Sequence, residues 1–511
     1  QGYSSAASDV YKRQASSGMA MAHWEIQGWM ILILGWVFVP FYSRSMVYTM
    51  PEFLERRYNP QSRTILSVIS LVSYVLTKVA VTVYAGGLVF QQVFGIKELW
   101  GIDFFWIAAI GLVVLTALYT IFGGMKSVLY TSVLQTPILL LGSLIILVLG
   151  FKELGGWDEM MRVCGAVTVN DYGDTMTNLI RSNDDANFPW LGALIGSAII
   201  GFWYWCTDQF IVQRVLSGKN EKEARRGTIF GAYLKLLPVF LFLIPGMIAF
   251  ALHQKYIGAG GEGFLPMLAN GTANADAAFP TLVAKLLPAG VKGLVVCGIL
   301  AALMSSLASL FNSSAMLFTI DFYKRFRPET PEKKLVGIGQ IATVVIVILG
   351  ILWIPIMRSV GDVLYTYLQD VQSVLAPGIA AAFLLGICWK RTSAQGGMWG
   401  LIAGMIIGLT RLGAKVYYSN AGEVADSTFK YLFYDMNWLF FCGWMFLFCI
   451  IVVIVVSLAT EAPTAEKIQG LVFGTATKEQ KAATRASWDH WDIIHTVIIL
   501  AITGAFYWYF W

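Results

Sequence analysis

The chain has 511 residues, of which 57% are hydrophobic and only 13% are charged, and its formal net charge is +5. Soluble domains carry about 25% charged residues, so the composition excludes an ordinary soluble protein and indicates lipid as the surroundings. The small net charge indicates no nucleic-acid partner. The four histidines are scattered, and neither a nucleophile–base pair nor a metal cluster is recognisable, so we do not expect an enzyme.

The polar leader QGYSSAASDVYKRQ (1–14) lacks the apolar segment of a signal peptide, and we interpret it as non-native-looking sequence. Twelve apolar runs follow, each long enough for a membrane-crossing helix of about 20 residues. Each must be helical, because lipid cannot pair with free backbone groups. The predicted runs are 18–42, 64–93, 101–121, 128–151, 188–212, 227–253, 292–320, 336–358, 363–387, 397–417, 437–459 and 490–511.

The loops predict the orientation of the chain. We expect a tight turn at Phe122-Gly123-Gly124-Met125 and a long external loop over residues 152–187. Lysine and arginine gather in the loops that lie on the same side as residues 43–63, and by the positive-inside rule that side is cytoplasmic. This asymmetry predicts a multi-pass protein of the plasma (inner) membrane with its C-terminus outside.

Polar residues concentrate in four of the runs, whereas the eighth, tenth and eleventh runs are nearly bare of charge. Polar groups are costly inside a membrane, so they are functional candidates by default. We therefore expect a polar bundle that forms a solute pathway and is surrounded by lipid-facing helices.

The segment WYWCTDQ (203–209) is the first of these polar clusters. On a helix, Tyr204 and Asp208 share one face, and Trp205 and Gln209 share the adjacent face. The aromatic rings could stack on a sugar while the polar groups bind its hydroxyls. The alternative is an interfacial aromatic belt, with Asp208 at the lipid headgroups.

Two charged residues lie inside other runs. Lys235 either snorkels to the inner surface or acts as a fixed donor to a solute hydroxyl or as the partner of a buried carboxylate. Glu25, in the first run, is either a near-surface carboxylate or a functional acid.

The seventh and ninth runs also carry polar patterns. Serines recur at near-helical spacing in LMSSLASLFNSSAM (303–316). Neutral oxygens suit a hard cation such as Na+, and the alternative is packing of small residues. In the ninth run, Gln369 and Asp370 precede Pro377-Gly378 by about two turns. This dipeptide favours a mid-membrane break of the kind that lines transporter sites, with a simple kink as the alternative.

Five segments together resemble the sodium/glucose cotransporter branch of the sodium:solute symporters, and the similarity covers nearly everything after residue 15. They are YTMPEFLERRY (48–58), LYTIFGG (118–124), WYWCTDQFIVQRVLSGKN (203–220), LMSSLASLFNSSAMLFTIDFY (303–323) and LAPGIAAAFLLGICWKR (375–391).

The resemblance implies an all-α integral membrane protein with a leucine-transporter-like core of two inverted five-helix repeats. It also implies an N-terminally truncated chain that starts at the second core helix. Residues 15–151 would be the rest of the first repeat, 188–387 the second repeat, and 388–511 additional C-terminal transmembrane helices.

The resemblance also implies roles for individual residues. Tyr204 would be the inner gate that stacks on the sugar, and Trp205 would lie beside the pocket. Glu25, Lys235 and Gln369 would bond sugar hydroxyls. The residues implied for Na+ are Ser305, Ser306 and, through its carbonyl, Ala302.

Departures from the family pattern affect the ion count and the sugar. Ser132 and Ala308 replace residues of many two-sodium members, which favours one coupled Na+. Gly201 stands where a galactose-transporting relative has a sugar-binding Asn, which leaves the identity of the hexose open.

The sequence predicts Na+-coupled uptake of a glucose- or galactose-like hexose by alternating access. The expected partners are the sugar, Na+ and the lipid bilayer, and the oligomeric state stays open. One alternative is a symporter of the same fold for inositol, sialic acid or an amino acid. The other is a sugar-gated sensor or channel.

Overall fold

A computed structural model describes residues 18–267, 273, 277–360, 364–420 and 425–511. Nearly all of this part is helical, and its one sheet is the antiparallel pair β1 (Glu98–Leu99) and β2 (Ile102–Asp103). A helix pairs every backbone group within one segment, which is what a bilayer demands. The leader predicted at 1–14 lies outside the described residues.

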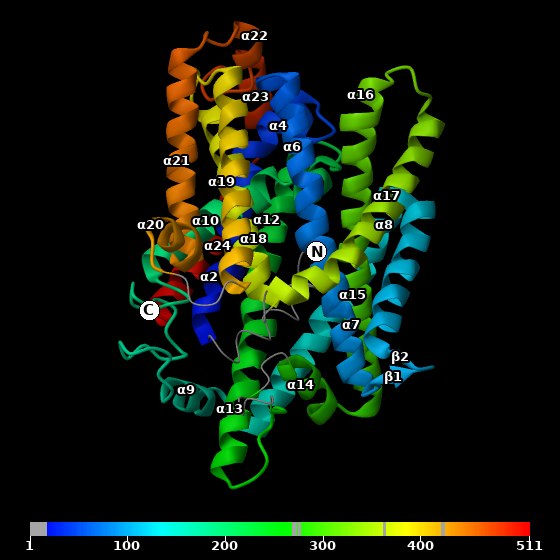
Figure 1. Ribbon diagram of the computed structural model, residues 1–511, viewed down its shortest axis with the longest axis vertical. Helices are drawn as coiled ribbons and strands as arrows, with labels where there is room; N and C mark the ends of the chain where they lie inside the picture. Colours follow the sequence, from blue (N-terminus) through cyan, green and yellow to red (C-terminus); the bar gives the residue numbers. More distant parts are fainter. Residues whose placement is uncertain (1–17, 268–272, 274–276, 361–363, 421–424) are drawn as a thin grey trace.

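Long helices lie side by side along the height of the molecule (Figure 1). Up to residue 258 they are η1 (Gly18–Met21), α2 (Ala22–Glu25), α3 (Gly28–Ile33), η2 (Leu34–Phe38), α4 (Val39–Ser45), α5 (Met50–Arg57), α6 (Pro60–Ser73), η3 (Tyr74–Val79), α7 (Ala80–Phe94), α8 (Phe104–Leu154), α9 (Trp157–Gly165), α10 (Trp190–Gly201), η4 (Phe202–Thr207), α11 (Gln209–Leu216), α12 (Glu221–Pro238), η5 (Val239–Leu243) and α13 (Ile244–Gly258).

The remaining helices begin after the loop that follows α13. They are α14 (Ala278–Leu286), α15 (Ala289–Met316), η7 (Leu317–Tyr323), α16 (Lys324–Phe326), α17 (Glu332–Val360), α18 (Leu364–Cys388), α19 (Ala394–Asn420), α20 (Thr428–Lys430), η8 (Tyr431–Asp435), α21 (Trp438–Ala459), α22 (Ala465–Ile468), α23 (Lys478–Ala486) and α24 (His490–Tyr509).

The predicted membrane runs are largely confirmed. In the described residues, 11 helical spans are long and apolar enough to cross a membrane, and the shorter apolar helix Phe104–Leu118 falls within the remaining predicted run. The eighth, tenth and eleventh runs are among the outer ones, because the most apolar windows of their helices α17, α19 and α21 are only 28%, 39% and 33% buried. This low burial fits the outer scaffold expected from their lack of charge.

Two predicted interruptions are wrong. The turn expected at Phe122–Met125 does not break α8, and the break expected at Pro377-Gly378 does not interrupt α18. Glycines cost a helix only about 1 kcal/mol each, and lipid penalises unpaired backbone more than that. Gly378 instead allows close packing, since a Cβ there would lie 3.0 Å from the Gly404 Cα in α19.

Real breaks occur in two other spans. In the first span, Ile26 and Gln27 separate α2 from α3, with ψ angles of 16° and 27° instead of about −42°. In the fifth span, Asp208 separates η4 from α11 with ψ 128°. Both breaks fall next to residues that the sequence marked as candidates, which directs attention to these two places.

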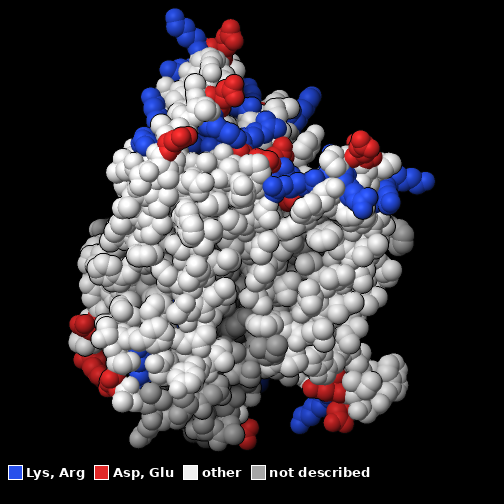
Figure 2. All heavy atoms as spheres, turned by 45° about the horizontal axis from the view of Figure 1, so that its top comes forward, with Lys and Arg blue, Asp and Glu red and all other residues white. Residues whose placement is uncertain are grey.

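Charge divides the surface into zones. Lysine and arginine side chains gather at one end of the molecule, and a broad belt below them is almost free of charge (Figure 2). That end carries α16, α22 and α23 (Figure 1), which belong to loops predicted to be cytoplasmic. We call it the basic end.

Candidate functional site

The segment WYWCTDQ turns from one helix into another inside the protein. The π-helical η4 ends at Thr207, and Asp208 then caps α11 by accepting the backbone N–H of Phe210 at 3.0 Å. Such a cap satisfies a donor of the first helical turn. Asp208 is only 5% exposed, so it lies within the bundle and the headgroup alternative is wrong for this residue.

Lys78, on η3, neutralises Asp208. Its Nζ donates to Oδ2 of Asp208, while the Tyr74 hydroxyl donates to Oδ1. The Nζ also lies 4.7–4.8 Å from the ring centroids of Tyr74, Tyr204 and Phe210, where aromatic faces attract a cation. Lys78 was not among the predicted site residues, although a lone lysine in the apolar run 64–93 was a usable signal.

Glu25 and Lys235 form a second buried ion pair. The Lys235 Nζ lies 2.9 Å from Oε2 of Glu25, and the two side chains are 8% and 7% exposed. Nearby, Gly28 allows α3 to pack closely against α12, because a Cβ at this position would lie 3.0 Å from the Ala232 carbonyl oxygen. Of the alternatives left open for Lys235, the structure excludes snorkelling and shows the partner of a buried carboxylate.

The aromatic residues join these two ion pairs. Tyr204 and Trp205 contact edge to face, with ring centroids 5.1 Å apart. The Trp205 ring lies 5.5 Å from the Lys235 Nζ, whereas the Tyr204 ring faces Lys78. The predicted binding residues Glu25, Tyr204, Trp205 and Lys235 therefore meet around η4. Both aromatic rings are partly exposed.

Gln369 lies on α18, which packs against η4. Its side chain is buried, and Oε1 has no hydrogen-bond partner in the described part of the chain. The neighbouring Asp370 is bound by Lys415 of α19. The tenth run was predicted to be nearly bare of charge, yet its Lys415 and the buried Arg411 point into the bundle.

The residues implied for Na+ share one buried stretch of α15. Ala302, Ser305 and Ser306 are 7%, 3% and 2% exposed, and the spacing puts the Ala302 carbonyl next to the serines. One turn further, the Ser309 hydroxyl donates to the carbonyl of Ser305 at 2.9 Å. Neutral carbonyl and hydroxyl oxygens in a buried place fit the ligand preference of a hard cation.

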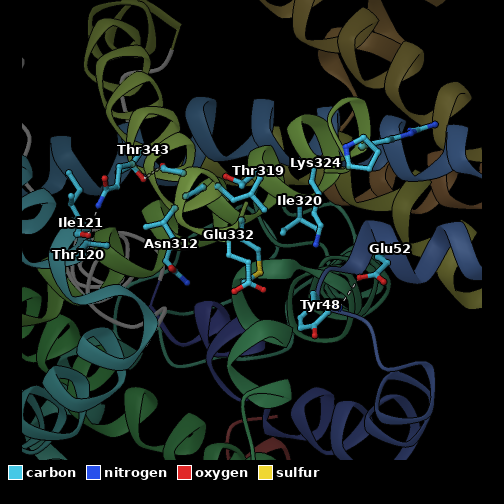
Figure 3. Close-up of a pocket in the computed structure, with 18 of the residues that line it drawn as sticks. Tyr48, Glu52, Thr120, Ile121, Asn312, Thr319, Ile320, Lys324, Glu332 and Thr343 are labelled. Atoms are coloured by element: carbon cyan, nitrogen blue, oxygen red, sulfur yellow. Dashed lines mark hydrogen bonds between the residues drawn. The ribbon is translucent and has the colours of Figure 1, made fainter. Parts of the chain in front are cut away.

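A cavity of about 850 Å³ is lined by later residues of the same helix, from Asn312 to Met316, and by Arg63, Lys324 and Arg325. Figure 3 shows Asn312 and Thr319 at its wall, with Glu332 and Lys324 close by. Met316 also lines it, and the Met316 sulfur accepts the Gln209 side-chain N–H at 3.6 Å. None of the predicted binding residues belongs to this cavity as the described residues define it.

Arg63 closes one side of the cavity through a buried network. Its Nε donates to Oδ1 of Asp321 at 2.7 Å, and the Thr49 hydroxyl donates to the same oxygen at 3.0 Å. The network ties the start of α5 and the start of α6 to η7. It was not anticipated from the sequence, because Arg63 and Asp321 are 258 residues apart.

Comparisons with known protein sequences identify a family and several relatives. The sequence model of the Sodium:solute symporter family matches residues 12–404. The sodium/mannose cotransporter SLC5A10 of Bos taurus is 36% identical over 504 residues, covering 94% of this chain and 83% of that protein. Sodium/myo-inositol cotransporter 2 of Homo sapiens is 35% identical, with 90% and 69% covered. Sodium/glucose cotransporter 4 of Danio rerio is 34% identical, with 93% and 73% covered.

Two solved structures have a similar fold. A Na+-coupled sialic acid symporter in a substrate-bound outward-open state has a TM-score of 0.69 at 20% identity, covering 90% of this chain and 88% of that one. Mhp1, a nucleobase-cation-symport-1 family transporter in a closed conformation, has a TM-score of 0.52 at 12% identity, with 95% and 93% covered. These likenesses concern the fold alone, and they confirm the leucine-transporter-like class.

Proposed function

We propose that this chain, which belongs to the sodium:solute symporter family, takes up a hexose of the glucose or galactose type. It is a multi-pass membrane transporter, not an enzyme, and couples solute movement to Na+. The observation that carries the hexose proposal is the buried Glu25–Lys235 pair beside Trp205. The pair offers an acceptor and a donor without a net charge, which suits the hydroxyls of a neutral sugar.

The aromatic rings support the same choice. A sugar has apolar faces that stack on Trp205 and Tyr204, while its edge hydroxyls reach Glu25 and Lys235. Gln369 adds a buried carboxamide whose Oε1 accepts no hydrogen bond within the described part of the chain. The names of the relatives refer to mannose, myo-inositol and glucose, which are all neutral polyhydroxylated compounds.

The Na+ site of the proposal consists of the Ala302 carbonyl and the hydroxyls of Ser305 and Ser306, and it holds one ion. Na+ bound there would favour an outward-open state and complete the sugar site. Coupling requires that each ligand binds the two states with different affinity. Tyr204 would then move to release the sugar toward the cavity at the basic end, so that this cavity acts as the inner vestibule.

The basic end supports an orientation. By the positive-inside rule, the concentration of lysine and arginine in Figure 2 marks the cytoplasmic side of a plasma (inner) membrane. The C-terminus after α24 would then be outside.

A second candidate is symport of another solute, and a sialic acid transporter has the same fold. A carboxylated solute needs a cation that is not already neutralised. In the described residues around η4, Lys78 and Lys235 both have carboxylate partners, which favours a neutral polyol. A sugar-gated sensor or channel would bind the same sugars but would not concentrate them.

Uptake into proteoliposomes tests the proposal. Radiolabelled glucose and galactose are offered with an inward Na+ gradient or an equal K+ gradient, and concentrative uptake is expected only with Na+. Lys235→Ala and Gln369→Ala should impair this uptake, whereas Lys219→Ala, at an exposed loop position, should not. Equal uptake in Na+ and K+ would overturn the coupling, and unchanged uptake in both site variants would overturn the site.

A further inference from the structure

The break between α2 and α3 presents a polar side chain that has no role in the proposal above. Gln27 lies in this break and is only 3% exposed. Its Nε2 donates to the Ser197 carbonyl at 2.9 Å, which ties the break to α10. Its Oε1 accepts no hydrogen bond from any described residue. An amide oxygen that no protein group uses can accept a hydrogen bond from a ligand.

Gly201 provides the space that this amide fills. Its φ of −62° and ψ of −41° are ordinary helical values, so the backbone does not require glycine. A Cβ at this position would lie 2.5 Å from Oε1 of Gln27 and 3.0 Å from its Cδ. The carboxamide of Gln27 therefore occupies the space that a side chain at position 201 would fill.

The carboxamide is close to the rest of the candidate site. Gln27 follows Glu25 by two residues, and Gly201 precedes Trp205 by one helical turn. Glu25 and Trp205 both contact Lys235. Gln27 thus adds a neutral acceptor to a place that already has an ion pair and an aromatic face.

We propose that Gln27 contacts the transported solute and helps to determine its identity, with Oε1 accepting a hydrogen bond from one hydroxyl of a polyol. This rests on the proposed function, in which the solute is a neutral sugar or a related polyol. A site with a buried acceptor discriminates strongly against an analogue that lacks the matching hydroxyl, because the acceptor is then left unpaired.

The first test compares wild-type protein with Gln27→Met, which keeps the length of the side chain and removes the amide. The KM of Na+-driven uptake is measured for glucose, galactose, mannose and myo-inositol, and then for the monodeoxy analogues of the best solute. In wild-type protein, one analogue should show a KM about tenfold higher than the parent. In Gln27→Met that difference should vanish, while the KM of the parent rises about tenfold.

A purely structural role for Gln27 would raise every KM or lower the yield, without selecting one hydroxyl. Identical deoxy penalties in wild-type protein and Gln27→Met would therefore overturn the proposal. If wild-type protein takes up no polyol of the panel with Na+, the proposed function fails as well. If wild-type protein takes up a polyol with Na+ but the deoxy penalties are the same in Gln27→Met, only the proposed role of Gln27 fails, and the proposed function stands.

A relocation of the amide provides a second test that does not depend on Gln27→Met being folded. Gly201→Asn should impair uptake, because its side chain would displace the Gln27 carboxamide. Gln27→Ala combined with Gly201→Asn places a carboxamide in the same space from the other helix and should restore uptake at least tenfold over Gly201→Asn alone. Gly227→Ala is the control, since a Cβ there meets nothing within 4 Å. A double variant no better than Gly201→Asn would contradict the proposal.

Discussion

Charged residues inside the bundle are bound by partners on other helices. Lys78 binds Asp208 across 130 residues of sequence, and Lys235 binds Glu25 across 210. A single charge in a low-dielectric interior carries a desolvation cost of several kcal/mol, which a close partner offsets only in part. Such pairs are therefore weak sources of stability, and their position beside the aromatic rings of η4 favours a functional explanation.

Variants of the Glu25–Lys235 pair should affect the stability of the protein and its transport activity differently. Lys235→Ala leaves the Glu25 carboxylate buried without its cation, and we expect a loss of about 3–5 kcal/mol in the free energy of unfolding. Glu25→Gln combined with Lys235→Met removes both charges and should recover most of that loss, yet uptake should stay absent. Thermal unfolding in detergent and proteoliposome uptake measure the two effects. Uptake that returns together with stability would show that the pair is only structural.

Asp208 has two separable roles, since it caps α11 and neutralises Lys78. Asn is as good a helix cap as Asp, so Asp208→Asn should remove only the charge pairing, whereas Asp208→Ala should cost about 1 kcal/mol more. Adding Lys78→Met to Asp208→Asn should restore stability, because the unpaired cation is then gone. Melting temperatures of the four proteins, wild type included, decide this. Equal melting temperatures for the Asn and Ala variants would exclude the cap.

At the scale of elements, helix caps and close backbone contacts determine how the helices are placed. Arg57 is 1% exposed, and its guanidinium donates to the carbonyls of Gly386, Trp389 and Thr392 at the end of α18. Burial lowers the pKa of this guanidinium from its ordinary value, but arginine stays protonated in proteins. The cation satisfies the last carbonyls of the helix and suits the negative end of its dipole. It thereby attaches α5 to the helix that carries Gln369.

The contact between α18 and α19 depends on glycine. A Cβ on Gly404 would lie 2.7 Å from the Gly378 Cα, which is backbone and cannot turn away, whereas a Cβ on Gly413 of the same helix meets nothing within 4 Å. Gly404→Ala should therefore destabilise the protein by about 1–3 kcal/mol. Gly413→Ala should be neutral or slightly stabilising. Thermal unfolding compares the two, and equal melting temperatures would refute the close packing.

At the scale of the whole molecule, the charge-free belt and the basic end describe how the protein sits in a bilayer (Figure 2). The outer helices present large apolar side chains to the surroundings, and Trp444 of α21 and Val497 of α24 are 62% and 57% exposed. In water such a surface would aggregate, whereas in lipid it is the favourable face. The positive-inside rule predicts that the basic end faces the cytoplasm.

This orientation predicts which loops an antibody can reach. An epitope inserted after Gly260, in the exposed loop behind α13, should be detected on intact cells. The same epitope inserted after Ala476, just before α23, should be detected only after permeabilisation. The reverse pattern would place the basic end outside. Na+-driven uptake by both tagged proteins serves as the control for correct folding.

Local patterns in the sequence determined the fold class and the candidate residues. Hydrophobic length alone predicts membrane helices, because the bilayer has a set thickness and lipid pairs with no backbone group. Isolated polar residues in those helices marked Glu25, Lys235 and Gln369, since such residues are rare there without a function. The predicted roles of these residues stay predictions that the variants above test.

Only the tertiary structure decided which of these residues meet and where the helices break. The pairing of Lys78 with Asp208, and the fit of Gln27 into the space of Gly201, join segments that lie 130 and more residues apart. The break near Pro377 was wrongly expected, and the break at Ile26 and Gln27 was missed. Proline and glycine bias the local backbone by only a few kcal/mol. Contacts between neighbouring helices outweigh that bias, and no single segment contains them.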